Sequence, residues 1–182
     1  MPKVIVPLAI GFEEIEAITI VDILRRAGIE VIMASLESLH VKGAHGIEVK
    51  ADISLEEIDA STFDMIVLPG GLPGATHLSQ SSKVMTLLQS FDKENKAIAA
   101  ICAAPLALKS AGVLKNHYTC YPSFENHIKH DGYEFASKVV RDENITTSQG
   151  PSTSMEFALS LVTQLCGQEV AEKLSKELLL IS

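Results

Sequence analysis

The feature that most constrains the fold is a repeated alternation of short apolar runs with amphipathic segments. Residues 3–8 (KVIVPL) form a nearly continuous apolar run, which is typical of a strand buried on both faces. Residues 13–27 have helical periodicity, with acids in the first turn, Arg25 and Arg26 in the last, and Gly28 just beyond. Strands separated by helices of this length predict one mostly parallel sheet with helices on both faces.

The alternation continues to the end of the chain. It predicts strands over residues 3–8, 30–34, 64–68, 97–101, 118–121 and within 139–147, a hairpin over 40–49, and helices over 13–27, 81–91, 103–110, 153–166 and 169–179. Ser54 with Glu57, and Thr153 with Glu156, have the spacing of capping boxes that start helices. No linker or repeat interrupts the pattern, so we expect residues 1–182 to form a single α/β domain.

Charge and hydropathy exclude several classes of partner. The formal net charge is −8 and the one basic pair is Arg25–Arg26, which disfavours nucleic acids and anionic membranes. No apolar run approaches the roughly 20 residues needed to cross a bilayer. The first residues lack the basic and extended apolar regions of a signal peptide, so we expect a cytoplasmic protein.

Cysteine and histidine usage gives no sign of a cofactor. The three cysteines form no CxxC pair, which argues against a disulfide framework or a zinc site. None of the six histidines shows HxxxH or HxH spacing, and His127 with His130 is expected to be a solvated pair. We therefore expect neither a metal nor another cofactor.

Cys102 is the strongest candidate for a reactive side chain. It follows the small-residue strand 97–101 and directly precedes a helix, with Ala100 and Ala104 two positions away on either side. Small neighbours at these positions are typical of a nucleophile elbow, a sharp strand-to-helix turn. A thiol above a helix N-terminus is expected to have a lowered pKa. An inert buried cysteine is the alternative interpretation.

Glu16 is the candidate partner of Cys102, because it lies on the apolar face of the helix over 13–27. A carboxyl there is costly unless it is neutral or partnered. We favour a protonated carboxyl that hydrogen-bonds the Cys102 sulfur, whereas capping of backbone amides in the core is the alternative. Glu13 and Glu14 lie off this face, and we expect them to be solvated.

Glycines after the strand over 64–68 suggest how a reacting oxygen is held. Gly70 and Gly71 let backbone amides approach a substrate closely. The amides of Gly71 and Ala103 are therefore candidates for an oxyanion hole beside Cys102. A plain Gly-Gly turn is the alternative.

Five segments together resemble the ThiJ/PfpI superfamily, and most closely its subgroup of the Parkinsonism-associated deglycase and the bacterial YajL proteins. They are residues 11–16 (GFEEIE), 21–28 (VDILRRAG), 67–71 (VLPGG), 98–105 (IAAICAAP) and 147–151 (TSQGP). The resemblance covers essentially the whole chain. It implies a flavodoxin-like three-layer sandwich with a nucleophile elbow, usually as a homodimer.

The resemblance also implies roles for individual residues. It assigns the reactive cysteine to Cys102, the protonated glutamate to Glu16, the oxyanion amides to Gly71 and Ala103, and pocket positions to Gly70, His45, Tyr121 and Pro151. Tyr121 stands where some members carry a histidine, and an arginine that some members place near the pocket is replaced around His45.

Two functions of different class follow. One is cysteine-dependent chemistry on methylglyoxal or glycated thiol and amine adducts, of glyoxalase or deglycase type. The other is a non-catalytic redox sensor or redox-regulated chaperone that uses oxidation of Cys102. Protease activity is disfavoured because Ala103 replaces the histidine that PfpI-type proteases carry after the nucleophile, and glutamine amidotransferase activity because no late His-x-Glu is present.

The first helix also predicts an assembly. Besides the face around Glu16 it carries Ile15, Ile18, Val21 and Leu24, so apolar residues cover more than one sheet-facing stripe. A partner surface would cover the excess, and we expect a homodimer with this helix near the interface.

Overall fold

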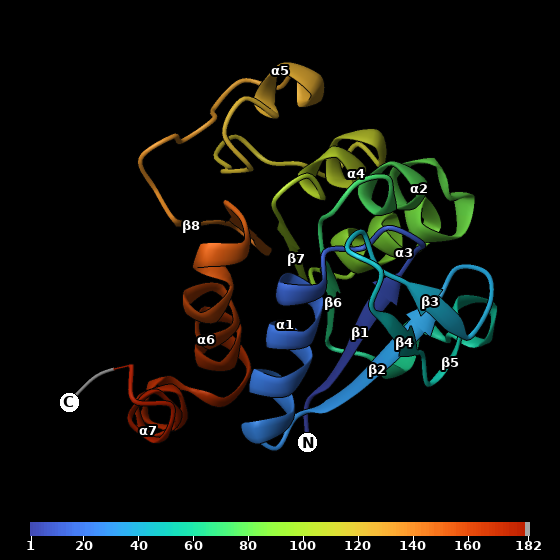
Figure 1. The fold of residues 1–182 in the computed structure, drawn as a ribbon. Coiled ribbons are helices and arrows are strands. Elements are labelled where there is room, and N and C mark those ends of the chain that lie inside the picture. Colours follow the sequence, from blue (N-terminus) through green and yellow to red (C-terminus); the bar gives the residue numbers. More distant parts are fainter. Residues whose placement is uncertain (181–182) are drawn as a thin grey trace.

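The computed structural model, which describes residues 1–180, has a seven-stranded sheet in the order β5-β2-β1-β6-β7-β9-β8. The strands are β1 (Lys3–Leu8), β2 (Glu30–Ser35), β5 (Ile53–Ser54), β6 (Met65–Leu68), β7 (Ala97–Ile101), β8 (Val139–Asp142) and β9 (Ile145–Ser148). All neighbours are parallel except β8 and β9 (Figure 1). The predicted mostly parallel sheet, a flavodoxin-like α/β fold, is confirmed.

Helices cover both faces of the sheet. They are α1 (Glu14–Arg26), α2 (Gly74–Gln80), α3 (Ser82–Lys93), α4 (Pro105–Ser110), α5 (Glu125–Ile128), α6 (Ser154–Cys166) and α7 (Gln168–Glu177). Figure 1 shows α1 and α6 on one side of the strands and α2, α3 and α4 on the other. None of the helices within residues 1–180 has the length and apolar character to span a membrane.

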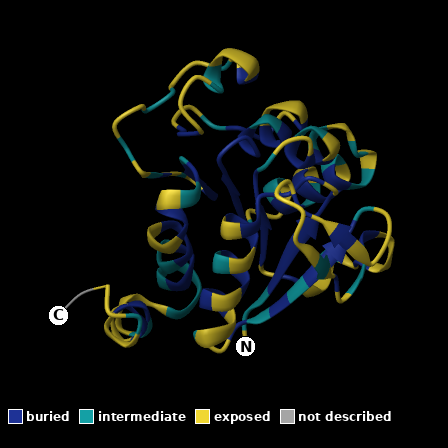
Figure 2. Cartoon of the chain, viewed as in Figure 1, coloured by how far each residue is buried: buried dark blue, intermediate teal, exposed yellow. Residues whose placement is uncertain are grey.

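The continuous apolar run of β1 is explained by its position between these layers. Val4 and Val6 belong to the core that α1 and α6 share with the sheet, whereas Ile5 belongs to the core beneath α3 and α4. Successive strand residues point to opposite faces, so both sets must be apolar. Figure 2 shows the sheet buried and the exposed residues concentrated on the outer helix faces and the loops.

The strand predicted over residues 118–121 is wrong. Of this segment only Tyr118 forms a bridge, with Tyr133, and the chain around it is largely irregular apart from α5. The reason lies in the sheet: β7 pairs with β6 on one side and with β9 on the other, which leaves no free edge beside it. The strand character predicted within residues 139–147 corresponds to two strands, β8 and β9, which form an antiparallel hairpin.

The two predicted capping boxes have different outcomes. Ser54 and Glu57 form one, at the start of a 3-10 turn over Leu55–Glu57. The prediction for Thr153 and Glu156 is wrong. A 3-10 turn over Pro151–Thr153 precedes α6, and the Thr153 hydroxyl bonds Ser148 and the Gly150 backbone instead.

A two-stranded hairpin lies outside the main sheet. It consists of β3 (His40–Lys42) and β4 (Glu48–Lys50), as predicted for residues 40–49. Its turn docks on the loop before α1, where the Gly11 N–H donates to the Lys42 carbonyl and the Ala44 N–H donates to the Phe12 carbonyl, both at 2.8 Å. The hairpin therefore reaches the carboxyl end of β1.

Candidate active site

Cys102 occupies a sharp turn between β7 and α4. Its backbone φ is +65°, a left-handed conformation that is strained for any residue but glycine. Two backbone hydrogen bonds of 2.9 Å hold Cys102 in this conformation. The Cys102 N–H donates to the Ser148 carbonyl, and the Cys102 carbonyl accepts from the Tyr121 N–H. The predicted elbow geometry is present.

Gly70 makes room for the site below this turn. A Cβ on Gly70 would lie 2.6 Å from Cys102 Cβ and 2.7 Å from Glu16 Oε2. Real side chains do not approach this closely, so only glycine lets Cys102 and Glu16 share the space at the end of β6.

Glu16 is completely buried on α1, as its position on the apolar face predicted. The Gly70 N–H donates to its Oε2 at 2.8 Å, while Oε1 is buried without a hydrogen-bond partner. Burial raises the pKa of the carboxyl to about 7, against the lowering effects of Cys102 and the Gly70 N–H. Near neutral pH the carboxyl is therefore protonated in a large share of the molecules.

The environment of Cys102 differs from the expected one. Burial raises the pKa of its thiol, as does the negative charge of Glu16, whereas the backbone amides of Gly71 and Ala103 lower it. The predicted lowered pKa of the thiol is therefore wrong, and burial is the largest cause of the difference. When Glu16 carries a proton, the repulsion disappears and its O–H favours the thiolate, so the two side chains titrate as one coupled pair.

A cavity of about 380 Å³ opens above the sulfur. Its walls are formed by Glu13, Ala44, His45, Gly71, Leu72, Cys102, Ala103, Tyr121 and Phe124. This one pocket is lined by five of the residues that the sequence singled out: Cys102, Gly71, Ala103, His45 and Tyr121. The backbone N–H groups of Gly71 and Ala103 donate toward the Cys102 sulfur, which places both amides beside this cavity.

Two further predicted positions lie outside this cavity wall. Gly70 lies beneath it, against Glu16. Pro151 begins a 3-10 turn and does not line the cavity; its neighbour Gly150 faces the Tyr121 ring instead. Leu72 and Phe124 do line it, and no local pattern in the sequence singled them out.

The interpretation of Glu13 and Glu14 as solvated acids is wrong. Their relative exposures are 8% and 5%, because the turn of the β3–β4 hairpin folds over them. Glu13 accepts the Glu16 N–H at 2.7 Å as the N-cap of α1, and Glu14 accepts from His45. The helical periodicity of α1 carried no information about a hairpin 30 residues further along the chain.

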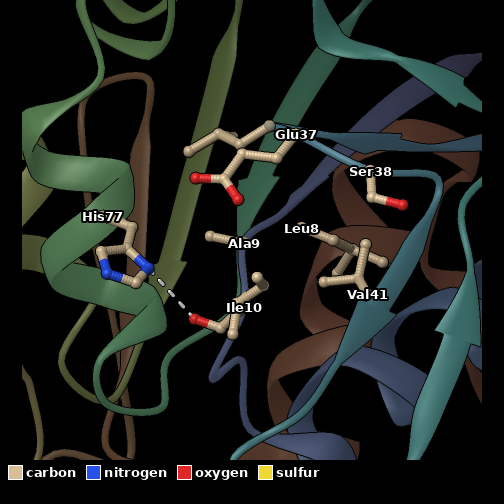
Figure 3. A pocket seen from close by; sticks show the side chains of 8 residues that line it. Leu8, Ala9, Ile10, Glu37, Ser38, Val41 and His77 are labelled. Atoms are coloured by element: carbon tan, nitrogen blue, oxygen red, sulfur yellow. Dashed lines mark hydrogen bonds between the residues drawn. The ribbon is translucent and has the colours of Figure 1, made fainter.

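A second depression lies at the end of β1, away from Cys102. Figure 3 shows it between Glu37, Val41 and His77. His77 Nδ1 lies 3.2 Å from the Ile10 carbonyl oxygen. Its volume is about 10 Å³. This space holds one water molecule at most, so the depression is too small for a substrate.

Fold and site together define an α/β protein with a cysteine at a nucleophile elbow and a buried carboxyl as its partner. The chain belongs to the DJ-1/PfpI family, whose family model matches residues 2–164. The resemblance seen in the sequence is confirmed.

Relatives of this chain come from plants and animals. It is 41% identical to the fruit fly (Drosophila melanogaster) "Protein dj-1beta" over 96% of this chain and 95% of that protein. It is 36% identical to the "Glutathione-independent glyoxalase DJR-1.2" of Caenorhabditis elegans, over 92% and 90%. "Protein DJ-1 homolog B" of Arabidopsis thaliana is 41% identical over 98% of this chain, which spans only 41% of that longer protein.

Solved structures of relatives have the same fold. The crystal structure of Drosophila DJ-1beta superposes with a TM-score of 0.94 at 40% identity, covering 98% of this chain and 97% of that one. "Toxoplasma gondii DJ-1, oxidized" superposes with a TM-score of 0.92 at 39% identity, covering 98% of both chains.

Proposed function

We propose that this protein is a cofactor-independent, cysteine-dependent enzyme of glyoxalase or deglycase type, which protects against methylglyoxal and its adducts with thiols and amines. The observation that carries the proposal is the pair formed by Cys102 at a strained elbow and the fully buried Glu16. The glyoxalase name of the Caenorhabditis elegans relative supports it.

The proposed reaction begins with addition of the Cys102 sulfur to the aldehyde carbon of methylglyoxal. A carbon–sulfur bond forms, and the negative charge that develops on the aldehyde oxygen is stabilised by the amides of Gly71 and Ala103. The oxygen takes up one proton in place of the one that the Cys102 thiol gives up, which completes a hemithioacetal.

Glu16 is the proposed proton carrier in the next step. It removes the proton on the former aldehyde carbon and returns one to the neighbouring carbonyl carbon, while the hydroxyl proton passes from the first oxygen to the second. The hemithioacetal thereby becomes a 2-hydroxy thioester. A pKa of about 7 suits both directions of this transfer, because the group gains and loses a proton readily at neutral pH. Water then hydrolyses the thioester, which releases lactate and restores the thiol.

Methylglyoxal consumption by the purified protein, compared with Cys102→Ser, tests this function. We expect loss of lactate formation in the variant. Equal rates in both proteins would exclude Cys102 as the nucleophile, and no lactate from the wild-type protein would exclude the reaction.

A second candidate function is redox sensing through Cys102, or a chaperone activity switched by its oxidation. Cys102 borders an open cavity, and the Toxoplasma relative is described as oxidised. Peroxide would convert the thiolate to a sulfenic and then a sulfinic acid, which Glu16 is placed to hydrogen-bond. A mass gain of two oxygen atoms confined to Cys102 at low peroxide, without methylglyoxal turnover, would favour this function.

A further inference from the structure

The β3–β4 turn and the start of α1 bring together three ligand-bearing side chains. One ligand atom from each of Glu13, Glu14 and His45 lies within 4.8 Å of the other two. His45 Nδ1 is 2.9 Å from Glu14 Oε2 and 3.8 Å from Glu13 Oε1. Ligands around a tetrahedral zinc ion, bonded at 2.0–2.1 Å, are about 3.3 Å apart, a spacing that lies between the two distances His45 Nδ1 makes to the carboxylates.

The backbone holds both carboxylates in this orientation. Glu13 accepts the Glu16 N–H through Oε2, which leaves Oε1 toward His45. Glu14 accepts the N–H groups of His45 and Ile47 through Oε1, at 2.7 and 3.3 Å, which leaves Oε2 toward the same ring. Hydrogen bonds to the second oxygen of each carboxylate are the usual support of a metal ligand.

The turn is shaped around Glu14. A side chain at Gly43 would collide with the Glu14 carboxylate, so the glycine lets the turn close over that group. The Ala44 N–H bonds the Phe12 carbonyl at 2.8 Å and fixes the turn against the start of α1. His45 itself remains exposed at the wall of the cavity, so an ion can reach its ring.

Backbone N–H groups and His45 are what satisfy the two carboxylates here, since Glu13 accepts one backbone N–H and Glu14 accepts two. Glu13 and Glu14 are 8% and 5% exposed, and buried carboxylates need a cation or strong donors. Within residues 1–180, no lysine or arginine forms an ion pair with either group, and His45 alone supplies a charge when protonated. A divalent ion would neutralise both carboxylates.

We propose that Glu13, Glu14 and His45 form a binding site for a divalent transition-metal ion of the zinc class at the rim of the Cys102 cavity. One imidazole nitrogen with two carboxylate oxygens suits such an ion better than calcium or magnesium, which prefer oxygen ligands throughout. The ion takes the place of the proton between His45 Nδ1 and Glu14 Oε2, and that proton leaves to solvent. Three protein ligands leave a fourth position for water on the open side.

The test is a zinc titration of the metal-free protein, by competition with a chromophoric chelator, in the wild type and three variants. His45→Arg keeps a cation beside Glu14 but cannot ligate, and we expect it to weaken zinc binding at least tenfold. His40→Arg is the matched control, because His40 is also paired with one glutamate, Glu48 at 3.0 Å, but with no second acid. It should bind zinc as the wild type does.

Cys102→Ser separates this site from the thiol and should also retain wild-type zinc affinity. Cobalt provides a second readout: the wild type should give d–d absorption without a sulfur-to-cobalt charge-transfer band. Thermal unfolding of each metal-free variant checks that the fold is intact. Unchanged zinc binding in His45→Arg, loss of binding in Cys102→Ser, or no binding by the wild type at 100-fold molar excess of zinc would overturn the proposal.

Discussion

The backbone N–H of Gly70 donates a 2.8 Å hydrogen bond to Glu16 Oε2, and the missing side chain of Gly70 leaves the space in which Glu16 and Cys102 meet. One residue thus supplies both the polar partner of a buried carboxyl and the room for the neighbouring sulfur. The chemistry proposed for the pair depends on this glycine as much as on the two reactive groups.

Gly70→Ala should therefore disturb the site more than the addition of one methyl group would elsewhere. The new Cβ would lie 2.6 Å from Cys102 Cβ, and overpacking of this kind costs about 1–3 kcal/mol. We expect the free energy of unfolding in urea to fall by this amount.

Gly150→Ala is the control for this substitution. Its backbone is extended, and the new Cβ would meet a movable atom of the Tyr121 ring at 3.2 Å. Its stability should stay within about 1 kcal/mol of the wild type. Equal effects of the two substitutions would show that Gly70 has no special part in the site.

Glu16→Gln should keep the fold and impair the chemistry. The amide oxygen can still accept the Gly70 N–H, but the side chain no longer exchanges protons. General acid–base catalysis contributes roughly 10²–10⁴ in rate, so we expect a loss of that order in methylglyoxal turnover. Glu16→Leu should also lose about 1–3 kcal/mol of stability, because the Gly70 N–H is left unsatisfied.

Rates of both Glu16 variants are to be measured beside their urea unfolding curves. Wild-type rates in both would remove Glu16 from the mechanism. A Glu16→Gln variant as unstable as Glu16→Leu would instead assign Glu16 a structural role only.

The raised pKa of Glu16 also predicts how stability depends on pH. The carboxyl has a pKa of about 7 in the folded protein and its ordinary value of 4.5 when unfolded. Folding therefore takes up a proton between these values. The stability contribution of the neutral carboxyl is fully present below pH 4.5 and is lost as the pH rises to about 7.

The size of this effect is on the order of 3 kcal/mol for a shift of this extent. Urea unfolding at pH 5 and pH 8, in the wild type and in Glu16→Gln, measures it. The wild type should lose more stability than the variant between the two pH values. Identical pH dependence in the two proteins would mean that Glu16 is ionised throughout.

Features encoded over a few adjacent residues were predictable from the sequence. The buried strand β1, the small neighbours of Cys102 and the apolar face around Glu16 are all set by local pattern. Features that depend on distant segments were not. The strand predicted over residues 118–121 is absent because β9 occupies the sheet position next to β7. Glu13 and Glu14 are buried by the β3–β4 hairpin, which the pattern of the helix cannot reveal.

Two apolar side chains on α1 face solvent and point to an assembly of two chains. Ile15 and Ile18 are 58% and 44% exposed. The sequence also assigned Val21 and Leu24 to the excess apolar face, which is wrong, because both are buried in the core of the chain itself. Met155, at the start of α6, is 44% exposed as well. Large apolar side chains that face solvent from neighbouring helices are typical of a protein interface, and we expect this surface to pair with a second copy.

Sedimentation equilibrium at micromolar concentration measures the assembly. The wild type should sediment as a dimer of the 19.6 kDa chain, and Ile15→Glu combined with Ile18→Glu should shift it toward the monomer, because burying two carboxylates in an apolar interface is costly. Leu39 is 38% exposed in the loop beside the small depression against α2, and the control substitution Leu39→Glu should leave the dimer intact. A wild type that sediments as a single 19.6 kDa species would show that these isoleucines face solvent in the working protein.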